Sequence, residues 1–225
     1  MFGALVYIGV EPILRKALPR ALVSWTRLIS GRLRDPLVGR DVLVGVSVAA
    51  LVVLIRFAGA VLPPSAGGVP ALRNTWAISA LASPWQIPAA LLIVPFYAAL
   101  TALFSLAGYV VNLAIFRRRD LAVLSLWGIF AMVSLARVQG IAGALLELLW
   151  FTILLWVLLQ VGVLAMTVTV YSITILIHLP LATDLSVWYA GRAAVGLLVI
   201  FGLAVYGFVI ALAGKPMFGR PVLDV

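Results

Sequence analysis

Two ionisable side chains, Arg56 and Glu147, lie inside long apolar stretches of the sequence. His178, the one histidine of the chain, lies at the end of such a stretch, where an interface is expected. A charged side chain at the centre of a bilayer costs about 2.5–3.5 kcal/mol on insertion scales, so such residues form pairs, extend to an interface or serve transport. Arg56 and Glu147 are therefore a candidate intramembrane polar pair. The alternative is that Arg56 extends to the outer interface and Glu147 has a structural role.

No catalytic or metal-binding pattern accompanies these residues. A proton relay needs two titrating groups at similar depth in the membrane. Glu147 lies inside an apolar stretch, whereas the distant His178 is expected near an interface, so the two do not make a relay. The chain has no cysteine, and one histidine without a carboxylate pair does not make a zinc site. The sequence also lacks the G-x-S-x-G, H-E-x-x-H and G-x-x-x-x-G-K-[ST] motifs. We therefore predict no enzyme activity, no cofactor and no metal.

The composition is that of an integral membrane protein. Of the 225 residues, 65% are hydrophobic and only 10% are charged, whereas soluble domains average about 25% charged residues. One span needs about 20 apolar residues, so the chain has room for about five or six spans. We predict an all-α polytopic membrane helix bundle, with residues 42–225 as a single transmembrane domain after a basic N-terminal region, residues 1–41.

Polar breaks divide the apolar sequence into the expected spans. These run over about residues 42–62, 89–116, 121–136, 141–160, 163–179 and 191–212. The break at residues 160–162 is weak, so five spans and an interfacial segment are the alternative to six. Lys215 and Arg220 favour a cytoplasmic C-terminus and therefore six spans. Asp41 precedes the first span, where a carboxylate favours the positive end of the helix dipole.

The chain has 16 Lys and Arg against 7 Asp and Glu, and the basic residues gather at two places. Residues 11–41 combine basic residues with apolar ones at helical spacing, which predicts an amphipathic helix on the membrane surface or against a partner. Three arginines follow the second span. Both places indicate the cytoplasmic side and anionic lipid headgroups rather than nucleic acid. The candidate contacts for a partner or for lipid are Arg32, Arg34, Asp35, Arg40, Asp41, Arg117, Arg118 and Arg119.

Several segments resemble a known kind of membrane region. SWTRLISGRLRDPLVGRD (Ser24–Asp41), PLATDLSVWYAGR (Pro180–Arg192) and AVYGFVIALAGKPMFG (Ala204–Gly219) resemble the C-terminal polytopic membrane region of large bacterial serine/threonine protein kinases, of the type common in acidobacteria. YIGVEPILRK (Tyr7–Lys16) resembles the end of a span and its basic loop, which makes residues 1–10 the expected tail of a longer helix. The chain lacks the Gly-rich loop, strand lysine, H-R-D and D-F-G motifs of a kinase domain, so no catalytic residue carries over.

The resemblance implies a module of the bacterial inner membrane that anchors, or senses for, a cytoplasmic kinase-like partner. Two alternatives stay open. A small subunit of a respiratory or photosynthetic complex would account for the 7 tryptophans and for the glycines of the last span. A transporter or channel would line a cavity with Arg56 and Glu147.

Overall fold

The computed structural model describes residues 21–61, 86–135, 141–178 and 190–212. These residues form seven helices and no strand. The helices are α2 (Val23–Ile29), α3 (Pro36–Val61), α5 (Gln86–Phe116), α6 (Arg119–Leu135), α7 (Ile141–Gln160), α8 (Val163–His178) and α9 (Ala190–Ala211). Each expected span matches one long helix to within three residues at each end, except at the start of α3, and the weak break at residues 160–162 is a corner between α7 and α8. The expected polar break at residues 137–140 and the expected helix tail at residues 1–10 lie outside the described residues.

Helix α3 begins at Pro36, earlier than residue 42, because Asp35 caps it. The Asp35 Oδ1 accepts the backbone N–H of Leu37 at 2.9 Å, and its carbonyl accepts the N–H of Gly39 at 3.1 Å. Proline suits the first helical position because it lacks an N–H and already has a helical φ. Asp41 lies in the second turn instead, so the prediction that Asp41 begins the helix is wrong, and Asp35 takes that role.

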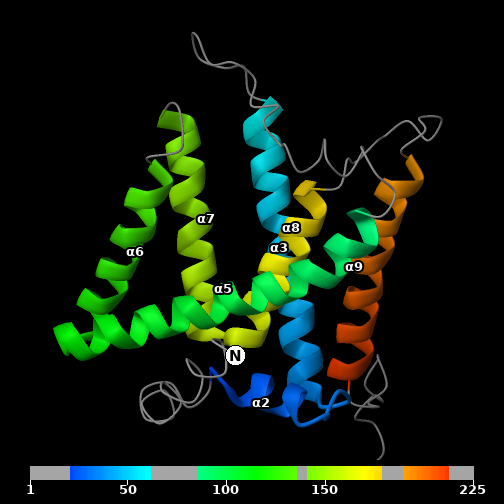
Figure 1. The fold of residues 1–225 in the computed structure, drawn as a ribbon, viewed down its shortest axis with the longest axis horizontal. Coiled ribbons are helices and arrows are strands. Elements are labelled where there is room, and N and C mark those ends of the chain that lie inside the picture. Colours follow the sequence, from blue (N-terminus) through cyan, green and yellow to red (C-terminus); the bar gives the residue numbers. More distant parts are fainter. Residues whose placement is uncertain (1–20, 62–85, 136–140, 179–189, 213–225) are drawn as a thin grey trace, which may run out of the picture.

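Helix α8 is the centre of the bundle (Figure 1). It contacts α2, α3, α5, α7 and α9, and most of its side chains from Val163 to Ile175 are buried. Helix α3 lies beside α8 and α9, and α5 crosses α8 obliquely. Helices α6 and α7 complete the other side, where α6 packs on α5 and α7 packs on α8.

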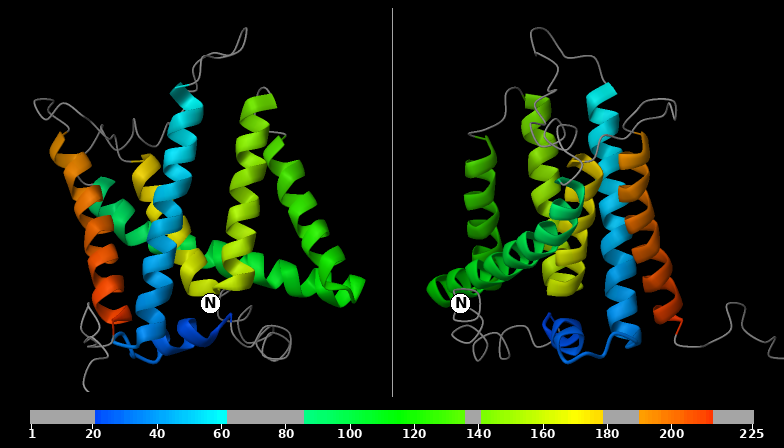
Figure 2. Two further views of the ribbon diagram at one scale, coloured as in Figure 1. Left: turned by 180° about the vertical axis from the view of Figure 1, so that it is seen from behind. Right: turned by 45° about the vertical axis from the view of Figure 1, so that its right-hand side comes forward.

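Helices α3, α6, α7, α8 and α9 run roughly along one common axis, whereas α5 lies across them at a large angle (Figures 1 and 2). Both views in Figure 2 place α2, the start of α3, the α5–α6 corner, the α7–α8 corner and the end of α9 toward one end of the bundle. The end of α3 and the start of α9 lie toward the other end. We call the first the basic end, because its exposed arginines include Arg32, Arg34, Arg40 and Arg117–Arg119.

Glycines allow α9 to approach α3 closely. A Cβ atom at Gly39 would lie 2.5 Å from the backbone nitrogen of Ala211, and one at Gly207 would lie 3.0 Å from the carbonyl oxygen of Gly39. Small residues at such crossings are typical of helix packing in lipid. Gly207 thus lies at the crossing of α3 and α9, whereas a Cβ atom at Gly202 would meet no neighbouring atom within 4 Å.

Among the described residues, three helices are long and apolar enough to cross a membrane: Pro36–Ile55 in α3, Pro88–Phe116 in α5 and Ala194–Ala211 in α9. Shorter apolar stretches cover residues 144–160 and 163–177. Large apolar side chains project from the outside of α5 and α9, as in Leu92, Phe96, Leu198 and Phe201. An apolar outer surface of this extent marks contact with a membrane or with other membrane helices.

Candidate functional site at the basic end

Helix α2 lies across the basic end of the bundle, at a large angle to α3 (Figure 1). Leu22 and Ser24 are buried, and Trp25 and Leu28 pack against the core between α3 and α8. The apolar face of this part of the basic segment thus packs on the chain's own helices, rather than on the membrane surface or a partner as the sequence predicted. Ile29 is the exception, with 65% of its surface exposed.

Two further contacts connect the ends of this segment to distant helices. The backbone N–H of Val163, at the α7–α8 corner, donates to the carbonyl oxygen of Ala21 at 3.0 Å. Gly162 makes this approach possible, because its φ is +134° and a Cβ there would lie 2.7 Å from the same oxygen. At the other end of the segment, the hydroxyl of Tyr206 in α9 donates to the carbonyl oxygen of Leu33.

An ion pair connects α2 to the start of α3. The Arg27 Nη1 lies 2.6 Å from the Asp35 Oδ2. The hydrogen bond from the Leu37 N–H lowers the pKa of Asp35 below its ordinary value of 3.8, against the opposing effect of desolvation. The hydrogen bond and charge of Arg27, and then the charge of Arg32, lower this pKa further. Asp35 therefore serves the fold, and its carboxylate is already engaged rather than available to a partner.

The lowered pKa of Asp35 predicts a loss of stability in acid. A carboxyl group whose pKa is lower in the folded state stabilises the fold above its unfolded value of 3.8, and this contribution disappears as the pH falls through the lower folded pKa. In detergent micelles at pH 7, the thermal midpoint of Asp35→Asn should be lower than that of the unchanged protein. Below pH 3.8 the difference between the two midpoints should shrink. An equal difference between the two proteins at both pH values would contradict this role.

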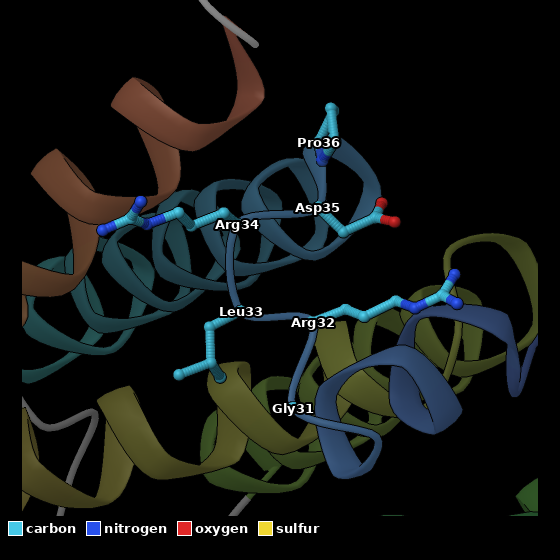
Figure 3. A pocket seen from close by; sticks show the side chains of 6 residues that line it. All are labelled: Gly31, Arg32, Leu33, Arg34, Asp35 and Pro36. Atoms are coloured by element: carbon cyan, nitrogen blue, oxygen red, sulfur yellow. The ribbon is translucent and has the colours of Figure 1, made fainter.

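Residues 31–36 line a shallow, open hollow beside α2 (Figure 3). The side chains of Arg32 and Arg34 point in opposite directions from it, and both are exposed. Arginines that diverge in this way cannot close on one small anion. They suit a broad anionic surface, because each guanidinium can contact a separate carboxylate or phosphate.

Arg40 and Asp41 differ sharply in exposure. The side chain of Arg40 is 57% exposed, whereas that of Asp41 is 1% exposed. The Arg40 Nε and Nη2 donate to the Asp41 Oδ1 at 3.0 and 2.8 Å. Arg40 therefore stays a candidate contact for a partner, but the prediction that Asp41 is one is wrong, because its carboxylate is inside the bundle.

Arg117, Arg118 and Arg119 are all exposed at the α5–α6 corner. The corner is tight, since Arg117 has a φ of +54° and its N–H still donates to the Leu113 carbonyl oxygen at 2.9 Å. All views place this corner at the basic end, but on the far side of the bundle from the α2–α3 connection. The fold thus brings the two arginine clusters to one end without joining them into one patch.

The predicted pair of Arg56 and Glu147 stays a prediction. Arg56 belongs to the last third of α3 and Glu147 to the first third of α7, and these helices contact each other. Both positions are toward the end opposite the arginine clusters. Glu147 is half-buried, and the side chain of Arg56 lies outside the described part of the chain.

Within the described residues, no three His, Asp or Glu side chains gather closely enough to hold a metal ion. Comparison of the chain with family models, curated proteins and solved structures finds no match. Gly162 and Tyr206 belong to the candidate site but were not predicted, because their contacts join residues that are far apart in the sequence.

Proposed function

We propose that the chain is a non-catalytic module of the bacterial inner membrane that holds a cytoplasmic, kinase-like partner at its basic end. The observation that carries this proposal is that both exposed arginine clusters are at one end of a helical bundle with an apolar exterior. Basic residues concentrate on the cytoplasmic side of membrane proteins. The basic end is then cytoplasmic, and the anionic headgroups of the inner leaflet surround it.

In this proposal all six long helices cross the membrane. Helices α3, α6, α7, α8 and α9 run roughly along one axis, which supports a crossing by each of them. Residues 88–116 of α5 are long and apolar enough to cross as well, although α5 lies at a large angle to the other helices. The shortest, α8, has 16 residues and is about 24 Å long, less than the hydrocarbon core of about 30 Å. A helix that is enclosed by α2, α3, α5, α7 and α9 does not have to match the lipid thickness, because protein rather than acyl chains surrounds it.

The partner contact in this proposal is formed by Arg32, Arg34 and Arg40. All three are exposed, and Arg32 and Arg34, in the connection between α2 and α3, diverge. This arrangement favours an acidic protein surface over a small ligand. The resemblance of Ser24–Asp41 to the membrane region of serine/threonine kinases supports a kinase-like domain as that partner.

The proposal is tested by purification in a gentle detergent from the cell of origin, followed by intact-mass analysis. We expect a stoichiometric cytoplasmic partner. Replacing Arg32, Arg34 and Arg40 by Gln should remove at least about 90% of it, because each exposed arginine contributes a charge-assisted hydrogen bond. The matched control replaces Arg117, Arg118 and Arg119 by Gln, which removes the same charge at the other cluster and should leave the partner bound.

Other outcomes contradict the proposal in different ways. Equal loss of the partner in both triple variants would mean that total charge, and not this site, retains it. Stoichiometric membrane subunits without a cytoplasmic protein would indicate a subunit of a larger membrane complex. A chain that purifies alone would contradict both functions and make transport the function to test.

A further inference from the structure

Residues 21–34, which we call the strap, connect three helices at the basic end. The Ala21 carbonyl oxygen accepts the Val163 N–H at the start of α8, and the Leu33 carbonyl oxygen accepts the Tyr206 hydroxyl from α9. Arg27 pairs with Asp35 at the start of α3. The strap also carries Arg32 and Arg34, so the proposed partner would bind to the same segment that ties α3, α8 and α9 together.

One buried polar group destabilises the docked position of the strap. The Ser24 hydroxyl is buried and has no hydrogen-bond partner among the described residues. A buried hydroxyl that is left unpaired loses its bonds to water without replacement. Release of the strap would expose Leu22 and Trp25 to water, which costs free energy. Release would also return the Ser24 hydroxyl to water, which offsets part of that cost.

We propose that the strap is releasable and that an acidic partner favours its release. This inference rests on the proposed partner at the basic end. A partner shifts a conformational equilibrium only if it binds one conformation more tightly. Arg27 supplies that difference: in the docked strap it is engaged by Asp35, whereas a released strap presents it together with Arg32 and Arg34. Partner binding would thereby loosen the connection between α8 and α9.

The test uses the full chain in lipid nanodiscs and measures how fast a cysteine at position 24 reacts with a maleimide. The chain has no cysteine, so Ser24→Cys introduces one thiol at a site that is 3% exposed. Ile29→Cys, at a residue that is 65% exposed, is the reference for a fully accessible strap position. We expect the cysteine at position 24 to react much more slowly than the one at position 29.

Two perturbations should then speed the reaction at position 24. Tyr206→Phe removes only the hydroxyl that holds Leu33, and should raise the rate about threefold to tenfold, as loss of one hydrogen bond implies. Tyr97→Phe, at an exposed tyrosine of α5, is its matched control and should leave the rate unchanged. A poly-glutamate peptide, as the acidic probe, should raise the labelling rate of Ser24→Cys. It should not raise this rate when Arg32→Gln and Arg34→Gln are also present.

Each contrary result overturns a defined part of the inference. Equal rates at positions 24 and 29 would mean that the strap is not docked, and an unchanged rate in Tyr206→Phe would mean that α9 does not hold it. Fluorescence anisotropy of labelled poly-glutamate reports binding in the same sample. Binding that leaves the rate unchanged would overturn the release mechanism alone, whereas absence of binding would also contradict the acidic partner of the proposed function.

Discussion

Gly207→Ala should destabilise the bundle by about 1–3 kcal/mol, the usual cost of inserting a methyl group where nothing can yield. The added Cβ would lie 2.9 Å from the backbone nitrogen of Leu43 and 3.0 Å from the carbonyl oxygen of Gly39. Both atoms belong to the backbone of α3, so α9 would have to move away as a whole. We expect a lower thermal midpoint in detergent micelles, measured by the loss of helical circular dichroism.

Gly202→Ala is the matched control on the same helix. Nothing lies within 4 Å of a Cβ at Gly202, and alanine is the better helix former by about 1 kcal/mol. This variant should keep the midpoint or raise it slightly. If both substitutions lowered the midpoint equally, the close crossing of α3 and α9 at Gly39 and Gly207 would be contradicted.

Gly162→Ala should also be strongly destabilising, for two separate reasons. A φ of +134° is a backbone conformation that is essentially confined to glycine, and another residue there costs on the order of 1–3 kcal/mol. The added Cβ would also lie 2.7 Å from the carbonyl oxygen of Ala21. We therefore expect a lower thermal midpoint together with faster maleimide labelling of Ser24→Cys, because the corner would push the strap away.

Gly31→Ala separates the cost of backbone strain from the cost of the close contact with Ala21. Gly31 has a φ of +79°, but a Cβ there would meet nothing within 4 Å. This control should cost the backbone strain alone, and therefore less than Gly162→Ala. A larger loss in Gly31→Ala than in Gly162→Ala would contradict the account of the α7–α8 corner.

The helices themselves were predictable because their boundaries depend on local chemistry. Arg117–Arg119 end one apolar run and begin the next, and the structure has its corner there. The start of α3 was misplaced because two aspartates compete for the capping role. The Asp35-Pro36 pair matches the pattern of a capping residue followed by a first-turn proline. This pattern predicts the helix start better than the position of Asp41 directly before the apolar run does.

The contacts of the candidate site depend on tertiary structure and leave little trace in the sequence. Tyr206 and Leu33 are 173 residues apart, and no local sequence pattern in α9 or in the α2–α3 connection links them. The break at residues 160–162 was weak because Gly162 ends α7 through its own φ and through contact with Ala21, which composition does not reveal. The inward packing of Trp25 was missed for a related reason, since an amphipathic pattern is the same whether lipid or protein covers its apolar face.

The central claim is that six crossings place both arginine clusters on the cytoplasmic side. Because the chain has no cysteine, single cysteines can report the side of each position in oriented membrane vesicles. Ser30, Arg118 and Gly191 are suitable positions, since all three are exposed and Gly191 has no neighbour within 4 Å of a Cβ. The reagent is a maleimide that does not cross the membrane.

The account predicts that Ser30→Cys and Arg118→Cys react only from the cytoplasmic side, and that Gly191→Cys reacts only from the opposite side. Labelling of Gly191→Cys from the cytoplasm would contradict six crossings and favour the five-span arrangement. Labelling of Ser30→Cys and Arg118→Cys from different sides would contradict the shared basic end itself.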